Sequence, residues 1–187
     1  MGKIPGEVFL AIQTISIPYV AFVYSAPEKT DEDCLTLNVW SPDTHASLPV
    51  IVWIHGGGWR TGSSSMPVFD GSHYAEIGNV VFVTINYRLG VLGWAAHPDL
   101  RDADTGAFAN WAVQDQVAAL HWVSDNIAAF GGDPDRITVM GQSGGAINSI
   151  MRIGSVTAPL GSSSLAATRA ASRSRSAIAT FAPSLTN

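Results

Sequence analysis

The chain has 187 residues, of which 47% are hydrophobic and 13% charged, with a formal net charge of −5 and one cysteine. This length suits one ordinary domain with a buried core, and the composition is that of a soluble globular protein. A net negative chain offers no basic surface for nucleic acid. An internal disulfide needs two cysteines, so a reduced, cytoplasmic location is slightly favoured over secretion.

The segment Val8–Tyr24 is apolar enough to be tested as a signal peptide or a membrane span. It is shorter than the roughly 20 residues that a span needs, polar residues and Pro18 interrupt it, and no clear A-x-A cleavage site follows. We therefore expect no membrane partner, and we expect residues 1–25 to form a small β element. Cys34, at the start of the next strand, is expected to be a small buried residue.

Two continuous apolar runs, at residues 50–54 and 80–85, predict parallel strands that are covered on both faces. Residues 35–40 alternate between apolar and polar side chains, which predicts a half-buried strand. Residues 72–77 predict a short helix between the two buried strands. This alternation of strands and helices favours an α/β fold.

A longer helix is predicted from Asn110, which can cap it, to about Ala129. Its apolar residues recur at helical spacing and should pack on the sheet; they are Val113, Val117, Leu120 and Ile127, with Trp111, Val123 and Phe130 beside them. Polar residues in and around this helix are expected to be structural: Arg88 as an ion-pair partner, Asp115, Asp125 and Asp133 as caps or ion pairs, and His121 without a catalytic role.

The pattern G-x-S-x-G appears at Gly141–Gly145. Residues 136–140 before it predict a short buried strand, and residues 146–151 after it can open a helix. A serine at a sharp strand-to-helix turn has strained backbone and an exposed hydroxyl, and side chains two positions away would collide in that turn. The pattern in this context predicts Ser143 as a nucleophile; a turn of small residues is the alternative.

A second glycine-rich segment, His55–Trp59, follows the apolar run at 50–54. Three successive glycines let the backbone approach a substrate and point N–H groups into a cavity. An oxyanion hole requires such donors, fixed where negative charge develops. A flexible glycine turn is the alternative interpretation.

These segments resemble the type-B carboxylesterase/lipase family, which includes the cholinesterases. The likeness lies in Phe130–Gly145 and in a second signature, Glu32–Pro42, and it extends from about residue 32 to residue 150. The resemblance implies an α/β-hydrolase fold, a small-molecule ester substrate and a structural role for His55. It also implies oxyanion-hole donors from the N–H groups of Gly57, Gly58 and Gly144. Relatives more often carry alanine at position 144, so we expect glycine to hold its donor less firmly.

In this fold class an acid and then a histidine follow the serine, but no Asp, Glu or His follows Ser143. The five histidines (45, 55, 73, 97 and 121) all precede it. Residues 154–187, of which 16 are Ser or Ala, predict a low-complexity, disordered tail. We expect a truncated copy of the family domain in residues 1–153, ending after the strand and helix around the serine. The last strand would then be a bare apolar edge that promotes self-association.

The sequence thus predicts a carboxylic ester hydrolase by family, with weak or no activity as an isolated chain because an unassisted serine is a poor nucleophile. A non-catalytic binding or adhesion-type domain on the same scaffold is the alternative. A serine-dependent acyltransferase would use the same site and differ in the acceptor. No ligand spacing predicts a metal or another cofactor.

Overall fold

The computed structural model describes residues 30–104, 106, 108–156 and 176–181. The β element expected at residues 1–25 and most of the expected tail lie outside these ranges. Among the described helices, none is long and apolar enough to cross a membrane.

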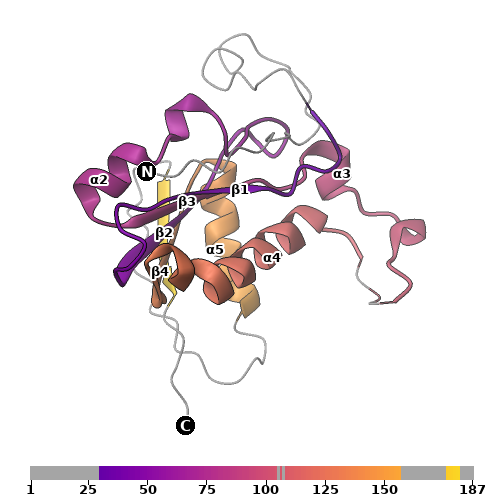
Figure 1. Cartoon of the computed structure of the whole chain (residues 1–187). Helices are drawn as coiled ribbons and strands as arrows, with labels where there is room; N and C mark the ends of the chain where they lie inside the picture. Colours follow the sequence, from indigo (N-terminus) through magenta and orange to yellow (C-terminus); the bar gives the residue numbers. More distant parts are fainter. Residues whose placement is uncertain (1–29, 105, 107, 157–175, 182–187) are drawn as a thin grey trace.

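One five-stranded sheet organises the molecule, in the spatial order β1-β3-β2-β4-β5 (Figure 1). Strands β3, β2 and β4 are parallel, whereas β1 and β5 pair antiparallel at either side. The strands are β1 (Leu37–Trp40), β2 (Leu48–Ile54), β3 (Val81–Ile85), β4 (Gly132–Gln142) and β5 (Ser176–Phe181).

Helices connect the strands. The α-helices are α2 (Ser72–Gly78), α3 (Gly90–Trp94), α4 (Trp111–Asn126) and α5 (Gly144–Val156), and the short 3₁₀ segments are η1 (Pro67–Phe69), η2 (Pro98–Leu100) and η3 (Ile127–Phe130). The strands and helices predicted near residues 35, 50, 72, 80, 110, 136 and 146 are confirmed. Strand β4 begins four residues earlier than the expected start at residue 136, and α3 was not predicted.

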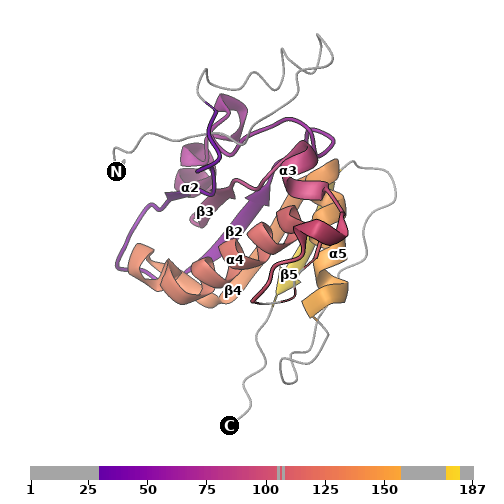
Figure 2. The same cartoon turned by 90° about the vertical axis from the view of Figure 1, so that its right-hand side faces the viewer.

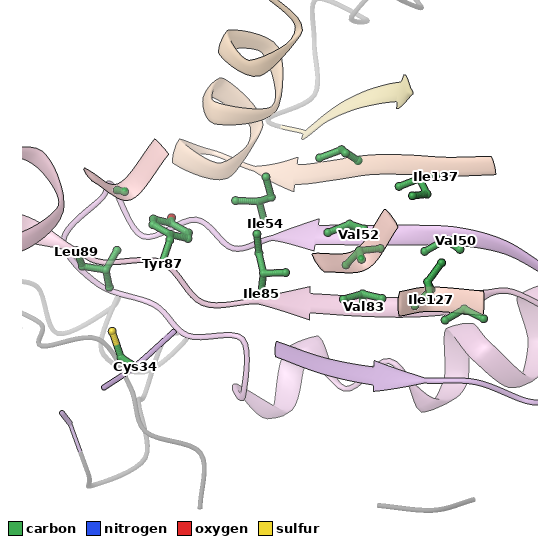
Figure 3. Close-up of a cluster of buried hydrophobic side chains, with 14 residues drawn as sticks. Cys34, Val50, Val52, Ile54, Val83, Ile85, Tyr87, Leu89, Ile127 and Ile137 are labelled. Carbon is green, nitrogen blue, oxygen red and sulfur yellow. The ribbon is translucent and has the colours of Figure 1, made fainter. Parts of the chain in front are cut away.

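The hydrophobic core is built from rows of side chains that cross the parallel strands. Register places Val52 beside both Val83 of β3 and Val139 of β4, and the rows on either side follow the same pattern. Figure 3 shows these side chains in line across the strands. Val123 of α4 and Ile127 of η3 pack against the rows. Because successive residues of a strand face opposite sides, one residue in two contributes to this layer.

The opposite face of the sheet is covered by α2 and η1. Phe82 stacks on Tyr74 of α2 with ring centroids 4.8 Å apart, and Trp53 contacts Phe69 of η1 at 5.5 Å. Ile51 and Trp53 remain only half-buried on this face. Strand 50–54 is thus covered on both faces, as predicted, but less completely on this one, whereas every residue of β3 is buried.

Helix α4 packs on the sheet partly as predicted, since Val123 and Ile127 lie in the core and Leu120 and Phe130 pack against it. Its buried residues are Ala112, Asp115, Gln116 and Val123, whereas Val113 and Val117 are only half-buried. Asp115 faces inward, where its carboxylate accepts hydrogen bonds of 2.6 and 2.8 Å from the Arg88 guanidinium. Figure 2 shows α4 crossing in front of the sheet. The expectation of an ion pair for Arg88 is confirmed, and its partner is Asp115, which was expected to be a cap or an ion-pair residue.

Three smaller expectations have clear outcomes. Asn110 is the N-cap residue of α4, but its side chain makes no capping hydrogen bond, because the residue adopts left-handed backbone with φ +56°. Asp133 forms an ion pair with Arg136 at 2.6 Å, as expected. Cys34 is buried and belongs to the hydrophobic core; burial raises the pKa of its thiol, as expected for a packed, unreactive residue.

The prediction of a bare edge at β4 is wrong. Strand β5 pairs with it over six residues, from Ile137 opposite Phe181 to Gln142 opposite Ser176 (Figure 2). The expectation of a disordered tail therefore fails for these residues. Backbone pairing needs no alternating side-chain pattern, so a serine- and alanine-rich segment gave no signal in the sequence. The ground on which we expected self-association, an uncovered β4, is thereby removed.

Candidate active site

Ser143 is the single residue between the end of β4 and the start of α5. Its backbone has φ +53°, in the left-handed region that side chains other than glycine rarely adopt. Such a conformation costs about 1–2 kcal/mol, and it persists only where the surrounding structure enforces it. The side chain is half-buried and lies outside the hydrophobic core. The sharp turn expected from G-x-S-x-G is therefore present.

The two glycines of the pattern are sterically required. A Cβ atom on Gly141 would lie 2.4 Å from the carbonyl carbon of Gly145, across the turn. A Cβ atom on Gly145 would lie 2.1 Å from the carbonyl oxygen of Ile54, at the end of β2. Both distances are shorter than real Cβ contacts, so the turn closes only with glycine at these positions.

The glycine loop begins directly after β2, the strand beside β4. Gly57 and Gly58 both have positive φ, +113° and +62°. The first glycine, Gly56, touches the serine turn, because a Cβ atom placed on it would lie 3.2 Å from Cβ of Ser143. The structure thus brings the glycine loop and the serine turn into direct contact, as two loops that leave adjacent parallel strands at the same edge.

Two hydrogen bonds fix the direction of the loop's peptide groups. The Gly56 carbonyl accepts from Nδ1 of His55 at 2.8 Å, and the Gly57 carbonyl accepts from the Thr61 hydroxyl at 3.1 Å. The described chain has no cis peptide bond, and a trans peptide points its C=O and N–H in opposite directions. The N–H groups of Gly57 and Gly58 therefore point away from His55 and Thr61.

Three backbone donors around the serine are unused. Within the described part of the chain, the N–H groups of Gly57, Gly58 and Gly144 donate no hydrogen bond. Gly144 is the first residue of α5, where helix geometry leaves N–H groups without an intrahelical acceptor. The positive end of the α5 dipole lies at the same place and favours negative charge.

His55 is buried and stacks on Tyr87, with ring centroids 4.4 Å apart. Burial lowers the pKa of His55 to about 4, partly opposed by its hydrogen bond to the Gly56 carbonyl. The ring is therefore neutral at pH 7, and Nδ1 carries the proton because a carbonyl oxygen only accepts. This geometry fits the structural role expected for His55, because the ring holds the glycine loop through its hydrogen bond to the Gly56 carbonyl.

No described histidine or carboxylate hydrogen-bonds to the Ser143 hydroxyl. The other four histidines, His45, His73, His97 and His121, are exposed. Nor do the described residues include a group of three or more His, Cys, Asp or Glu side chains that could hold a metal ion. The site as described therefore has a hydroxyl and backbone donors, without a hydrogen-bonded base among the described residues.

Sequence reasoning missed three residues that hold the site together. Thr61 anchors Gly57, while Trp59 and Asn148 are joined by a hydrogen bond of 3.0 Å from the indole Nε1 to Oδ1. Asn148 is fully buried on α5, and so is its neighbour Ser149. The sequence carries no local signal for the pair of Trp59 and Asn148, because the burial of Asn148 follows from contacts between distant segments.

Parallel central strands, with a strained serine turn between a strand and a helix and a glycine loop beside it, are features of the α/β-hydrolase fold. The chain belongs to the carboxylesterase family, whose model matches residues 11–181. The resemblance seen in the sequence is confirmed by this match.

The relatives are esterases and related hydrolases that are much longer than this chain. Fumonisin B1 esterase of Sphingopyxis macrogoltabida is 50% identical over 120 residues, covering 63% of this chain and 22% of the relative. Para-nitrobenzyl esterase of Bacillus subtilis (strain 168) is 47% identical, covering 67% and 25%. The carboxylesterase EST55 of Geobacillus stearothermophilus, solved at pH 6.2, superposes with a TM-score of 0.66 at 43% identity, covering 77% and 28%. The chain thus spans about a quarter of their length.

Proposed function

We propose that this chain carries the nucleophile and the oxyanion hole of a serine carboxylesterase, with Ser143 as the nucleophile and Gly57, Gly58 and Gly144 as donors. The observation that supports this most directly is the set of three unused backbone N–H groups around a strained serine turn. The esterase names of the relatives support a carboxylic ester as the substrate.

The chemistry follows from where charge develops. The Ser143 oxygen attacks the ester carbonyl carbon, and the carbonyl electron pair moves onto oxygen. Donors that are already fixed stabilise this oxyanion without the cost of reorganisation, and each is worth about 10²–10³ in rate. Collapse of the intermediate expels the alcohol and leaves an acyl-serine, which water then hydrolyses.

The serine proton needs an acceptor. In the family the order is serine, acid and histidine, and no Asp, Glu or His follows Ser143 in these 187 residues. His55 does not substitute, because its ring is buried and its Nε2, the nitrogen that could accept the proton, hydrogen-bonds to no described residue, Ser143 included. We therefore propose that the 187-residue chain by itself turns over esters weakly or not at all.

The decisive experiment tests whether Ser143 is a reactive nucleophile, whether or not the chain completes the hydrolysis of an ester. The unaltered chain and Ser143→Ala are treated with a fluorophosphonate, and the modified residue is identified by mass spectrometry. Attack of the serine oxygen on phosphorus with loss of fluoride should label Ser143 slowly. Ser47→Ala, which removes an exposed hydroxyl, is the matched control. Labelling at another residue, or equal labelling of Ser143→Ala, would overturn the assignment.

Hydrolysis of p-nitrophenyl butyrate tests the missing proton acceptor. We expect the unaltered chain to hydrolyse the ester at nearly the rate of Ser143→Ala. A rate well above that of the variant would show that a base is already present. The non-catalytic binding domain considered from the sequence gains no support from the relatives reported above.

A further inference from the structure

Trp59 follows the glycine loop and is held at three points. Its indole Nε1 donates to Oδ1 of Asn148 at 3.0 Å, its carbonyl accepts from the N–H of Gly90 at 2.8 Å, and its ring contacts Trp94 with centroids 5.6 Å apart. Its backbone is strained, with φ +63°. A large side chain in left-handed backbone is unfavourable, so these contacts must compensate for the strain.

The indole ring also occupies the space beside Gly144. A Cβ atom placed on Gly144 would lie 3.1 Å from Nε1 of Trp59 and 3.4 Å from its Cδ1 and Cε2. The first distance is tighter than ordinary contact, so an alanine at this position would have to displace the ring by a few tenths of an ångström. Glycine at position 144 is thus matched to tryptophan at position 59.

We propose that Trp59 is a positioning residue that joins the two halves of the oxyanion hole. This inference rests on the function proposed above. Gly58, one residue before Trp59, supplies one donor, and Gly144, beneath the indole ring, supplies another. The hydrogen bond to Asn148 ties the loop to α5, the helix that Gly144 begins. Any displacement of the loop relative to the helix breaks this bond.

The chemical groups of Trp59 and Asn148 fix which of the two residues donates their hydrogen bond. An indole N–H can only donate, so the amide oxygen of Asn148 must face it. Asn148 is fully buried, and its Nδ2 has no partner among the described residues. The Asn148 side chain cannot turn to solvent for another hydrogen bond. Trp59 is therefore the only described hydrogen-bond partner of its amide group.

A double-mutant cycle tests the ring contact without any ligand. Gly144→Ala should lower the midpoint of thermal unfolding by about 2–4 °C in the unaltered chain, as expected for a loss near 1 kcal/mol in a domain of this size. In the background of Trp59→Leu, which removes the ring, Gly144→Ala should have no such effect. Additive effects of the two substitutions would overturn the proposal, because residues in contact do not behave independently.

A reversible probe tests the donors themselves. The Ser143 oxygen adds to the boron of butylboronic acid, the hydroxyl proton passes to buffer, and the negatively charged tetrahedral boronate places one of its hydroxyl oxygens where the oxyanion would form. Trp59→Phe keeps an aromatic ring but loses the N–H. We expect its dissociation constant, measured by boron-11 NMR, to rise about tenfold. The control Trp122→Phe, an exposed tryptophan that packs on Phe130, should leave the constant unchanged.

The two measurements separate the inference from the proposed function. Weakened binding by Trp59→Phe, together with coupling in the cycle, supports both. Equal binding by Trp59→Phe and the unaltered chain would overturn the positioning role. If the unaltered chain binds no boronate while the cycle shows coupling, the serine assignment falls and the contact between Trp59 and Gly144 stands.

Discussion

Gly145 packs directly against the carbonyl group of Ile54, so closely that a Cβ atom on Gly145 would lie 2.1 Å from that oxygen. Helix α5 therefore starts on top of the end of β2. We predict that Gly145→Ala destabilises the chain by about 3 kcal/mol, because both sides of the contact are backbone and neither can yield. Urea unfolding followed by circular dichroism measures this loss.

Gly78→Ala is the matched control for that substitution. Gly78 lies in α2, and a Cβ atom there would meet only Val80, at 3.4 Å, which is ordinary contact. Alanine should stabilise the helix by about 0.5–1 kcal/mol. A similar loss in both variants would show that glycine content, and not the contact with Ile54, decides stability.

The ion pair between Arg88 and Asp115 gives a second prediction. The Asp115 side chain is 3% exposed and the Arg88 side chain 34% exposed. Arg88→Met leaves a buried carboxylate without its partner, and we expect a loss of about 2–4 kcal/mol, less than for a fully buried pair because Arg88 reaches solvent. Chemical unfolding at pH 7 gives the value.

Replacing both partners tests whether the loss comes from the unpaired charge. Arg88→Met combined with Asp115→Leu removes the carboxylate together with the guanidinium. This double variant should recover most of the stability that Arg88→Met loses. If it is less stable than either single variant, the ion pair itself, and not relief of an isolated charge, holds α4 in place.

His55 predicts a dependence of stability on pH. Its pKa falls from 6.5 to about 4 on folding, so between these values the unfolded chain binds more protons. The contribution of His55 to the free energy of unfolding is fully present above about pH 6.5. It declines as the pH falls to 4, and the total loss is about 3 kcal/mol. Urea unfolding at intervals from pH 7 to pH 4 should show this decline.

His55→Asn isolates the contribution of the imidazole. Its side-chain amide can donate to the Gly56 carbonyl as Nδ1 does, and it does not titrate in this range. The decline between pH 6.5 and 4 should therefore flatten. Asp133, whose pKa is lowered by its hydrogen bond to Arg136, acts in a more acidic range, below its ordinary value of 3.8. An unchanged decline would show that other groups cause it.

An added base should assist the serine. Because no described base contacts Ser143, imidazole in solution should accelerate its labelling by a fluorophosphonate severalfold at pH 8, where imidazole is neutral. The effect should fade at pH 5.5, where imidazole is protonated. Ser143→Ala reports the background at each pH. Labelling that is independent of imidazole would indicate that the chain already supplies a proton acceptor.

The elements that have strong local signals could be predicted from the sequence. Apolar runs gave β2 and β3, and the glycine spacing around Ser143 gave the turn between β4 and α5, because steric limits act within a few residues. The inward position of Asp115 on α4 could not be predicted, since it depends on Arg88, 27 residues away in the chain. Strand β5 was missed because its pairing uses backbone groups that every sequence has.

The residues of the candidate site likewise fall into those that the sequence identifies and those that it does not. Ser143 and the glycines are recognisable because their backbone geometry restricts residue type. Thr61, Trp59 and Asn148 support that geometry through contacts between segments, and Trp59 and Asn148 are 89 residues apart. Nothing local distinguishes such residues from ordinary loop and helix positions, so they become visible only in three dimensions.

The register of β2 with β4, which sets Ile54 opposite Gly141, has a consequence for changes in chain length. Insertions in the largely exposed connection at residues 101–104 leave both strand ends where they are, so the serine and the glycine loop should tolerate them. One residue inserted inside β4 would turn its side chains to the opposite face and carry the serine away from the loop. Engineering of this protein can therefore lengthen exposed connections but must keep the strand lengths unchanged.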